Sequence, residues 1–396
     1  MNNSDLIIAS IKKRKKREKR FRFYGLISLL FAVFALVMLF ASIAIPASNG
    51  FMQNYVKLDF PANIDAAKSN VAVKNALFQL FPEVSKFSEK RQLSMMLAPH
   101  AASFVPINSP AASALIPLSS NIDLWIKNPE NVIIPPKQQQ FITALKQRNL
   151  LVSKFNWEFF TSNDSRSPEK AGFYSAIIGS IYLVVICLIA ALPIGIAAAV
   201  YLEEFAPKNR FTDIIEININ NLAAVPSIIY GLLGLFIYLN IMSIPRSSAL
   251  AGGLTLALMT LPIIIISTRI ALKAVPSSIR NAALAIGASP LQVVAHHLLP
   301  QATGGIITGT ILGMSRAIGE TAPLLMIGMV AFIVNAPTSL LDPTTAMPVQ
   351  IYIWASSPEI GFVHKTACGI IILISILLCF NFAANRIRSR AERKYS

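Results

Sequence analysis

Long apolar runs are the feature that most constrains what this chain can fold into. A bilayer core of about 30 Å is crossed by a helix of about 20 apolar residues, and the backbone groups of that helix must bond within it. About six stretches meet this requirement: residues 21–45, 174–202, 217–242, 250–272, 304–334 and 367–384. The sequence therefore predicts an all-α transmembrane fold with about six membrane-spanning helices.

The charged residues predict the orientation of these spans. Only 14% of the residues are charged, and most of the net charge of +16 lies in segments 12–22 and 386–394. Basic clusters can bind nucleic acid or anionic lipid, but beside an apolar span they more often mark the cytoplasmic side. With an even number of spans, both basic termini, residues 1–20 and 385–396, are predicted to be cytoplasmic.

Residues 46–173 separate the first two spans and contain no long apolar run. With the N-terminus inside, this segment lies outside the cytoplasm, and its helix-like and strand-like stretches predict a small α+β domain. Cys187, Cys368 and Cys379 all lie elsewhere, in apolar runs without a CxxC pair, so neither a disulfide framework nor a metal site is predicted. The segment is either a docking domain or a spacer that packs on the spans.

The predicted cytoplasmic loop 273–303 has the pattern of a helix, a glycine turn at Gly287, a second helix and a proline stop at Pro300. It resembles the EAA loop of ABC-importer permeases, whose short helix sits in a cleft of the ATP-hydrolysing subunit. The residues that carry this resemblance, and the predicted ATPase-coupling site, are Asn281, Ala282, Ala283, Gly287, Leu299 and Pro300. Asn281 stands where the family usually has Glu, and an ordinary amphipathic interfacial helix is the alternative.

Arg316 and Glu320 lie near the middle of the predicted span 304–334. A charge at the centre of a membrane helix costs roughly 2.5 to 3.5 kcal/mol, so it normally faces a polar pathway or a partner. The i,i+4 spacing lets the two side chains pair, and a guanidinium binds a tetrahedral oxyanion through two parallel hydrogen bonds. These two residues predict either a reversible anion site or an ion pair that only fixes helix packing.

Three further motifs point to one family: GIAAAVYLEEFA at 195–206, NLAAVPSIIYGLLG at 221–234 and RAIGETAPLL at 316–325. Over roughly residue 171 to the C-terminus the chain resembles the PstA family, the permease subunits of phosphate-importing ABC transporters. The resemblance implies a substrate pathway that includes Arg316, Glu320 and Thr321. Pro226, Ser227 and Tyr230 are further candidates for lining it. Ahead of the loop, the chain has Arg269 and Ile270 where the family is expected to have acidic residues.

The resemblance also implies the location, a bacterial cytoplasmic (inner) membrane, and the partners. The chain has no GxxxxGK[ST] phosphate loop, so it is not predicted to be catalytic alone, and no cofactor is predicted. The expected assembly contains a PstC-like second permease subunit, an ATP-binding subunit dimer and an extracytoplasmic phosphate-binding protein. A permease for sulfate, molybdate or phosphonate is the alternative within transport. A membrane sensor with an extracytoplasmic domain is the alternative outside it.

Overall fold

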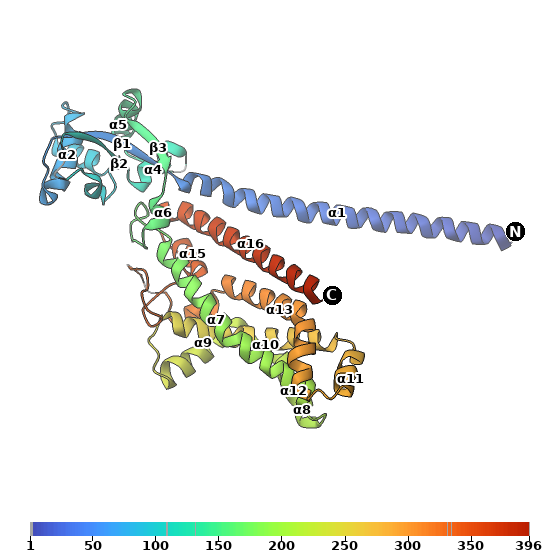
Figure 1. Cartoon of the computed structure of the whole chain (residues 1–396). Coiled ribbons are helices and arrows are strands. Elements are labelled where there is room, and N and C mark those ends of the chain that lie inside the picture. The colour runs from blue at the N-terminus through green and yellow to red at the C-terminus, as the bar shows by residue number, and fades with distance from the viewer. Residues whose placement is uncertain (1–2, 108–109, 131, 331, 334, 396) are drawn as a thin grey trace.

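The computed structural model describes residues 3–107, 110–130, 132–330, 332–333 and 335–395, and divides them into an external domain and a bundle of long helices (Figure 1). The first helix, α1 (Asn3–Phe51), leads without a break into the first strand, β1 (Met52–Phe60). The fold is mostly helical and its only described sheet belongs to the external domain, so the predicted fold class is confirmed.

The external domain is built on a three-stranded antiparallel sheet in the order β2-β1-β3. In its register Tyr55 lies opposite Pro117 of β2 and opposite Val152 of β3. Its elements after β1 are a 3-10 turn (Ala66–Lys68), α2 (Ser69–Gln79), α3 (Phe87–Ser94), a second 3-10 turn (Ala101–Phe104), β2 (Ala112–Pro117), α4 (Ser120–Lys127), α5 (Pro136–Gln147), β3 (Leu151–Phe155) and α6 (Glu158–Thr161).

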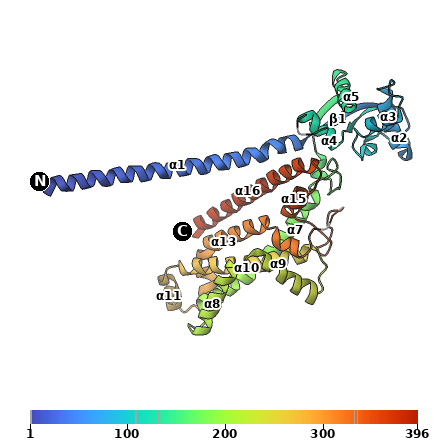
Figure 2. The same ribbon diagram turned by 180° about the vertical axis from the view of Figure 1, so that it is seen from behind.

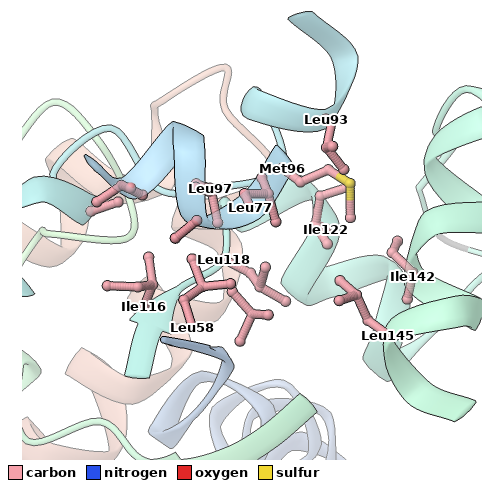
Figure 3. Close-up of a cluster of buried hydrophobic side chains, with 14 of the residues drawn as sticks. Leu58, Leu77, Leu93, Met96, Leu97, Ile116, Leu118, Ile122, Ile142 and Leu145 are labelled. Carbon is pink, nitrogen blue, oxygen red and sulfur yellow. The ribbon is translucent and has the colours of Figure 1, made fainter. Parts of the chain in front are cut away.

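One apolar core holds the domain together. Figure 3 shows side chains from the sheet, such as Leu58 and Ile116, meeting side chains from the helices, such as Leu77, Ile122 and Leu145. These five side chains are almost completely buried. Burial of a leucine or isoleucine contributes about 1.5 to 3 kcal/mol. The domain therefore has its own core. Its predicted start at residue 46 is too early, because α1 continues to Phe51.

The helical part contains the remaining elements. They are α7 (Tyr174–Val200), a π turn (Tyr201–Phe205), α8 (Arg210–Ala224), α9 (Ser227–Gly234), a π-helical segment (Leu235–Ile241), α10 (Ala249–Lys273), α11 (Ser277–Ala285), α12 (Pro290–Val293), a π turn (Val294–Leu298), α13 (Leu299–Gly319), α14 (Ala322–Met326), α15 (Met347–Ala355) and α16 (Gly361–Tyr395). The central helix is α10, which packs against both α7 and α13.

Small residues let these helices approach closely. A Cβ added to Gly253 of α10 would come within 2.5 Å of Ile186 of α7, and one added to Gly309 of α13 would overlap Ser267 of α10. Because lipid gives helices no hydrophobic reason to associate, close packing at such small residues is a principal source of their attraction.

The helices confirm several predicted spans and correct two. Among the described residues, four helices are long and apolar enough to cross a membrane, and the bent pair 210–241 would make five. That pair bends by 102°, so the predicted span 217–242 is broken. The predicted span 304–334 is also broken, because α13 ends at Gly319. Glycine and the nearby Pro323, which lacks a backbone N–H, both disfavour continuation of the helix.

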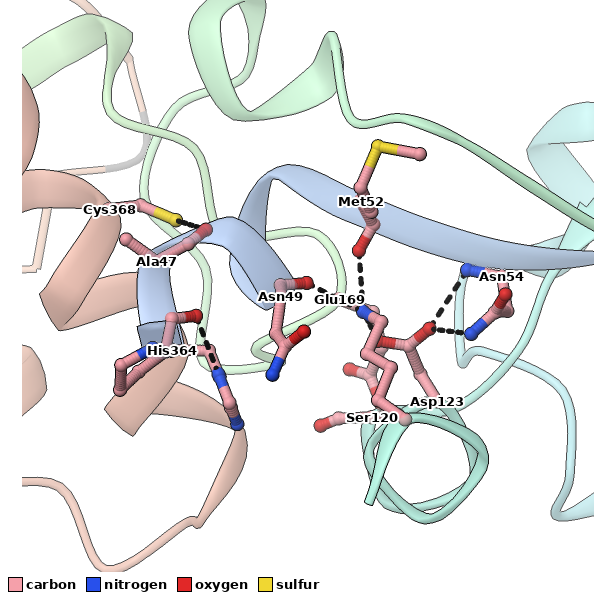
Figure 4. Close-up of polar contacts among 11 residues, drawn as sticks. Ala47, Asn49, Met52, Asn54, Ser120, Asp123, Glu169, His364 and Cys368 are labelled. Atoms are coloured by element: carbon pink, nitrogen blue, oxygen red, sulfur yellow. Dashed lines mark hydrogen bonds and ion pairs between the residues drawn. The ribbon is translucent and has the colours of Figure 1, made fainter. Parts of the chain in front are cut away.

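The external domain is joined to the helices by a compact polar cluster (Figure 4). The ammonium of Lys127, from α4, donates to the carbonyl oxygens of Asn49 (2.7 Å) and Met52 (2.5 Å) and pairs with Asp123. Asp123 in turn accepts bonds from the backbone and side-chain amides of Asn54, at 2.8 and 2.9 Å. A cation at the last carbonyls of a helix is favourable, so Lys127 stabilises the end of α1.

The first turns of α16 pack against the same end of α1. The Nδ1 atom of His364 lies 2.8 Å from the carbonyl oxygen of Pro46, and the Cys368 thiol donates to that of Ala47 at 3.3 Å. These two contacts hold the start of α16 against the last turns of α1. From this junction α1 and α16 diverge, and the apolar middle of α1 is exposed (Figures 1 and 2).

A second link ties the linker after α6 to α15. The indole N–H of Trp354 donates to Asp164 at 3.0 Å, and both side chains are buried. Burial raises the pKa of Asp164, although the bond from Trp354 opposes the shift. A raised pKa means that the folded protein holds this proton more tightly than the unfolded chain. The associated stability is therefore complete below the unfolded pKa and is lost as pH rises through the folded pKa.

Replacement of Lys127 by methionine should destabilise the external domain by about 3 kcal/mol, because Asp123 would remain buried without its cation. Pulse proteolysis of the full chain in urea measures this. The control is Lys137→Met, which removes the cation paired with Glu89; that lysine is 52% exposed, and its loss should cost less than about 1 kcal/mol. Equal effects of the two substitutions would contradict the capping role.

Candidate functional site

The loop after α10 forms a helical hairpin at the end of the bundle opposite the external domain (Figures 1 and 2). As predicted, a short helix, α11, is followed by a turn at Gly287, whose φ of +91° is a conformation that favours glycine. The predicted stop at Pro300 is wrong. Pro300 lies in the first turn of α13, where a missing N–H is tolerated, and the preceding π turn at 294–298 accommodates it.

The predicted coupling residues divide into a packed set and an exposed set. Ala283 is 4% exposed and packs with Leu272, Val293 and Leu298 under the hairpin. Leu299 and Pro300 are partly buried at the start of α13. Asn281, Ala282 and Gly287 are exposed on the hairpin. The loop therefore has its own small core.

Exposed apolar side chains complete the surface of the hairpin. Ile286 is 82% exposed, Leu291 is 68% exposed and Leu284 is 44% exposed. They stand on either side of the Gly287 turn. A group of exposed apolar residues at the tip of a hairpin is typical of a protein contact site.

Ion pairs hold the hairpin against the rest of the bundle. Arg280 of α11 donates to Glu204 at 2.5 Å, and Glu204 belongs to the π turn that ends α7. The neighbouring Glu203 lies 3.5 Å from Arg269 of α10, and Arg269 also pairs with Glu216 of α8. These pairs join α7, α8, α10 and α11 at one end of the bundle.

These ionic contacts were not predicted from the sequence. Arg269 was identified only as a departure from the acidic residues expected there. The structure shows that its acidic partners come from other segments, namely Glu203 in the turn that ends α7 and Glu216 of α8, while the adjacent Glu204 pairs with Arg280. The two consecutive acids at the end of an apolar run were the available signal, because charges at such a position often have a partner nearby.

The predicted ion pair between Arg316 and Glu320 is present. The Nε atom of Arg316 lies 3.2 Å from an Oε1 atom of Glu320, and the two side chains are 41% and 19% exposed. Their setting differs from the prediction, because Arg316 lies in the last turn of α13 and Glu320 follows the end of that helix in an extended conformation. A cation in the last turn interacts favourably with the helix dipole. Thr321 follows at the start of α14.

The break in the other bent span lies beside this pair. Pro226 separates α8 from α9, and the Tyr230 hydroxyl donates across the break to the carbonyl of Leu222 at 2.7 Å. Tyr230 is buried and lies within electrostatic range of Arg316. Pro226 is exposed and Ser227, the first residue of α9, is partly buried. The structure thus brings Tyr230 to the ion pair and leaves Pro226 at the surface.

A glycine allows α9 and α14 to meet. A Cβ added to Gly231 would lie 2.6 Å from the Cα atom of Pro323 and 2.8 Å from the Cβ atom of Met326. This contact joins the motifs at 221–234 and 316–325. Arg316 is 17 residues along α13 from Leu299, which corresponds to about 25 Å. The ion pair and the hairpin therefore lie at opposite ends of α13.

The fold and this site define a multi-pass membrane permease. Residues 191–395 match the family of binding-protein-dependent transport system inner membrane components, and the chain belongs to that family. Residues 8–128 match a domain of unknown function, DUF3333, which covers α1 and most of the external domain.

Two relatives illustrate the similarity. The phosphate transport system permease protein PstA of Haemophilus influenzae is 34% identical over 225 residues, which are 57% of this chain and 78% of that protein. The probable ABC transporter permease protein YqgI of Bacillus subtilis is 29% identical over 256 residues, 61% of this chain and 86% of that protein. A solved structure of the MetNI methionine ABC transporter in an inward-facing conformation is 20% identical to this protein. The alignment covers 55% of this chain and 97% of the transporter chain, but the TM-score of 0.44 supports no conclusion.

Loss of the Arg280–Glu204 pair should loosen α11. A partly exposed charge-assisted bond is worth about 1 kcal/mol, so Arg280→Ala should speed hydrogen exchange of the α11 amides about fivefold. Mass spectrometry of the full chain measures this. Lys273→Ala is the control, because Lys273 is 55% exposed and lies 3.6 Å from Glu203. The charge swap Arg280→Glu with Glu204→Arg should restore slow exchange. Unchanged exchange in Arg280→Ala, together with fast exchange in the charge swap, would contradict the role of the pair.

Proposed function

We propose that this chain is the membrane permease subunit of an ATP-driven importer and that it translocates inorganic phosphate. The observation that carries the proposal is the Arg316–Glu320 pair at the break between α13 and α14, within a segment that resembles the PstA family. The similarity to a phosphate transport permease over 78% of that protein supports the same cargo.

The ion pair has the chemistry that a transient anion site needs. A guanidinium offers parallel N–H donors to a tetrahedral oxyanion, and Glu320 neutralises it when the site is empty. The single contact of 3.2 Å through Nε leaves the terminal nitrogens of Arg316 available to a ligand, and the side chain is 41% exposed. Phosphate would therefore compete with Glu320 for Arg316, which gives binding that is reversible.

Tyr230 and Thr321 would complete this part of the pathway. The Tyr230 hydroxyl is a possible donor, although it bonds to the Leu222 carbonyl in this state. Thr321 follows Glu320 and begins α14. Broken helices in a membrane protein are tolerated where they are buried in protein or line a water-filled cavity, and they often form the substrate site. The two breaks at Pro226 and Glu320 fit that pattern.

The hairpin would transmit ATP-driven movement. In this proposal the exposed Ile286 and Leu291 dock on an ATP-binding subunit, and Asn281, Ala282 and Gly287 lie in the same contact. The Arg280–Glu204 pair would carry the movement to α7, while Leu299 and Pro300 begin the helix that ends at Arg316. Closure of two ATP-binding subunits would then move α13 as a rod and open the pathway outward. Hydrolysis would reset it inward.

The assembly and orientation follow from the same proposal. The chain would pair with a PstC-like permease subunit, two ATP-binding subunits and an extracytoplasmic phosphate-binding protein. Both basic termini would lie in the cytoplasm, on the same side of the membrane as the hairpin, and the external domain, residues 46–173, would lie outside. The hairpin and the external domain lie at opposite ends of the helical bundle, as this orientation requires (Figure 2).

Arg316→Gln should reduce ATP-dependent uptake of radiolabelled phosphate by about 10- to 100-fold in vesicles that contain all partner subunits, because bonds to a charged group are worth about 1.5 to 3 kcal/mol. Arg91→Gln, which removes an exposed charge of the external domain, is the control and should leave uptake unchanged at equal assembly. Uptake of sulfate, molybdate or phosphonate instead of phosphate by the unaltered complex would overturn the cargo and leave the permease assignment intact.

Ile286→Asp with Leu291→Asp should weaken binding of the ATP-binding subunit at least about tenfold, because burial of each apolar side chain contributes roughly 2 kcal/mol. Co-purification and titration with the isolated ATP-binding subunit measure this. Phe87→Asp alters a side chain of the external domain that is 83% exposed, and it serves as the control. Unchanged binding in the double variant would contradict the docking surface.

A further inference from the structure

A continuous series of aromatic rings runs from the helical bundle to the surface of the external domain. Its inner members are Trp354 of α15 and Phe173, which both lie against Phe159 with ring centroids 5.9 and 5.7 Å apart. Phe159 contacts Phe51 at the end of α1, at 6.0 Å. Phe51 stacks on Phe155 at 6.1 Å with an interplanar angle of 8°.

The outer end of this series is exposed. Phe159 and Phe173 are fully buried, whereas Phe155 is 40% exposed and Trp157, whose ring lies 4.9 Å from that of Phe155, is 70% exposed. Exposure of two neighbouring large aromatic rings is unfavourable in water. The buried inner rings, Phe159 and Phe173, stabilise the fold without any need for Phe155 and Trp157 to be exposed.

The rim formed by Phe155 and Trp157 lies at the end of α1, because Phe155 stacks on Phe51, the last residue of that helix. The predicted first span ends at Ile45, and Phe51 is six helical residues further, which is a rise of about 9 Å. One headgroup layer of a bilayer is about 5 to 8 Å thick. The stacking of Phe155 on Phe51 therefore places the rim about 9 Å past the predicted end of the span, at the outer edge of the headgroup layer.

The surroundings of the rim suit lipid. Ile45 of α1 is 66% exposed and Met52 of β1 is 39% exposed, so the apolar surface of α1 continues toward the rim. Lys154, which precedes Phe155 in the chain, is exposed. The carboxylate of the nearby Glu158 lies 3.6 Å from the ring of His100. Trp rings are enriched at the membrane interface, and lysines near the interface extend their ammonium groups to the phosphate layer.

We propose that the Phe155–Trp157 rim inserts into the outer headgroup layer and seats the external domain on the membrane surface. The occupant of this surface is phospholipid. The polar cluster around Lys127 then holds the external domain to α1, and the rim holds the same domain to the bilayer. The proposal does not depend on the cargo, so a failure of phosphate transport would leave it standing.

Tryptophan fluorescence of the full chain in lipid nanodiscs tests this. Phospholipids brominated near the top of their acyl chains quench only nearby indoles. The chain has three tryptophans, and the difference between the unaltered chain and Trp157→Phe isolates the emission of Trp157. We expect brominated lipid to quench most of that difference signal. Trp125→Phe is the control, because Trp125 packs against the core of the external domain and its removal should leave the lipid-quenched signal unchanged.

Two results would overturn the proposal. In the first, iodide in the water quenches the Trp157 signal and brominated lipid does not. In the second, brominated lipid quenches the signal in the isolated chain but no longer does so in the importer assembled with its partner subunits, which would make the rim a subunit interface. Persistence of lipid quenching in the assembled importer is the expected outcome.

Discussion

The carbonyl groups at the end of a helix need partners, and the arrangement of this protein depends on the partners that the end of α1 finds. Lys127 reaches from α4 to the carbonyls of Asn49 and Met52, while His364 and the thiol of Cys368, from α16, bond to carbonyls one turn earlier. One short stretch of backbone therefore binds both the external domain and the helical bundle. The position of the domain follows from hydrogen-bond satisfaction at a single helix end.

The same requirement governs the two broken spans. The breaks at Pro226 and Glu320 lie near each other, because Gly231 of α9 lets α14 approach to contact distance. Tyr230 spans one break with its hydroxyl, and Arg316 faces Glu320 across the other. A partly exposed polar region is thereby assembled from two motifs almost 100 residues apart. At the far end of α13, buried Ala283 and the Arg280–Glu204 pair hold the hairpin as a small rigid unit.

Much of this organisation could be predicted from the sequence. The periodicity and length of the apolar runs indicated the long helices, and the spacing of Arg316 and Glu320 indicated their pairing. The Gly287 turn also has a local cause, namely a backbone conformation that glycine adopts readily. The breaks were harder to predict: segments 217–242 and 304–334 are apolar enough to span, so hydropathy alone gave no reason to interrupt them. The partners of Arg269 could not be predicted, since Glu203 and Glu216 come from other helices.

The membrane environment, the helical secondary structure and the charged residues that must find partners can all be predicted from the sequence, because each depends on local composition and on spacing along one helix. Only the tertiary structure decided which helices break, which acid meets which base and where the aromatic series reaches the surface. Those outcomes depend on contacts between segments far apart in the chain, and the energy of such a contact exists only once close packing has brought the segments together.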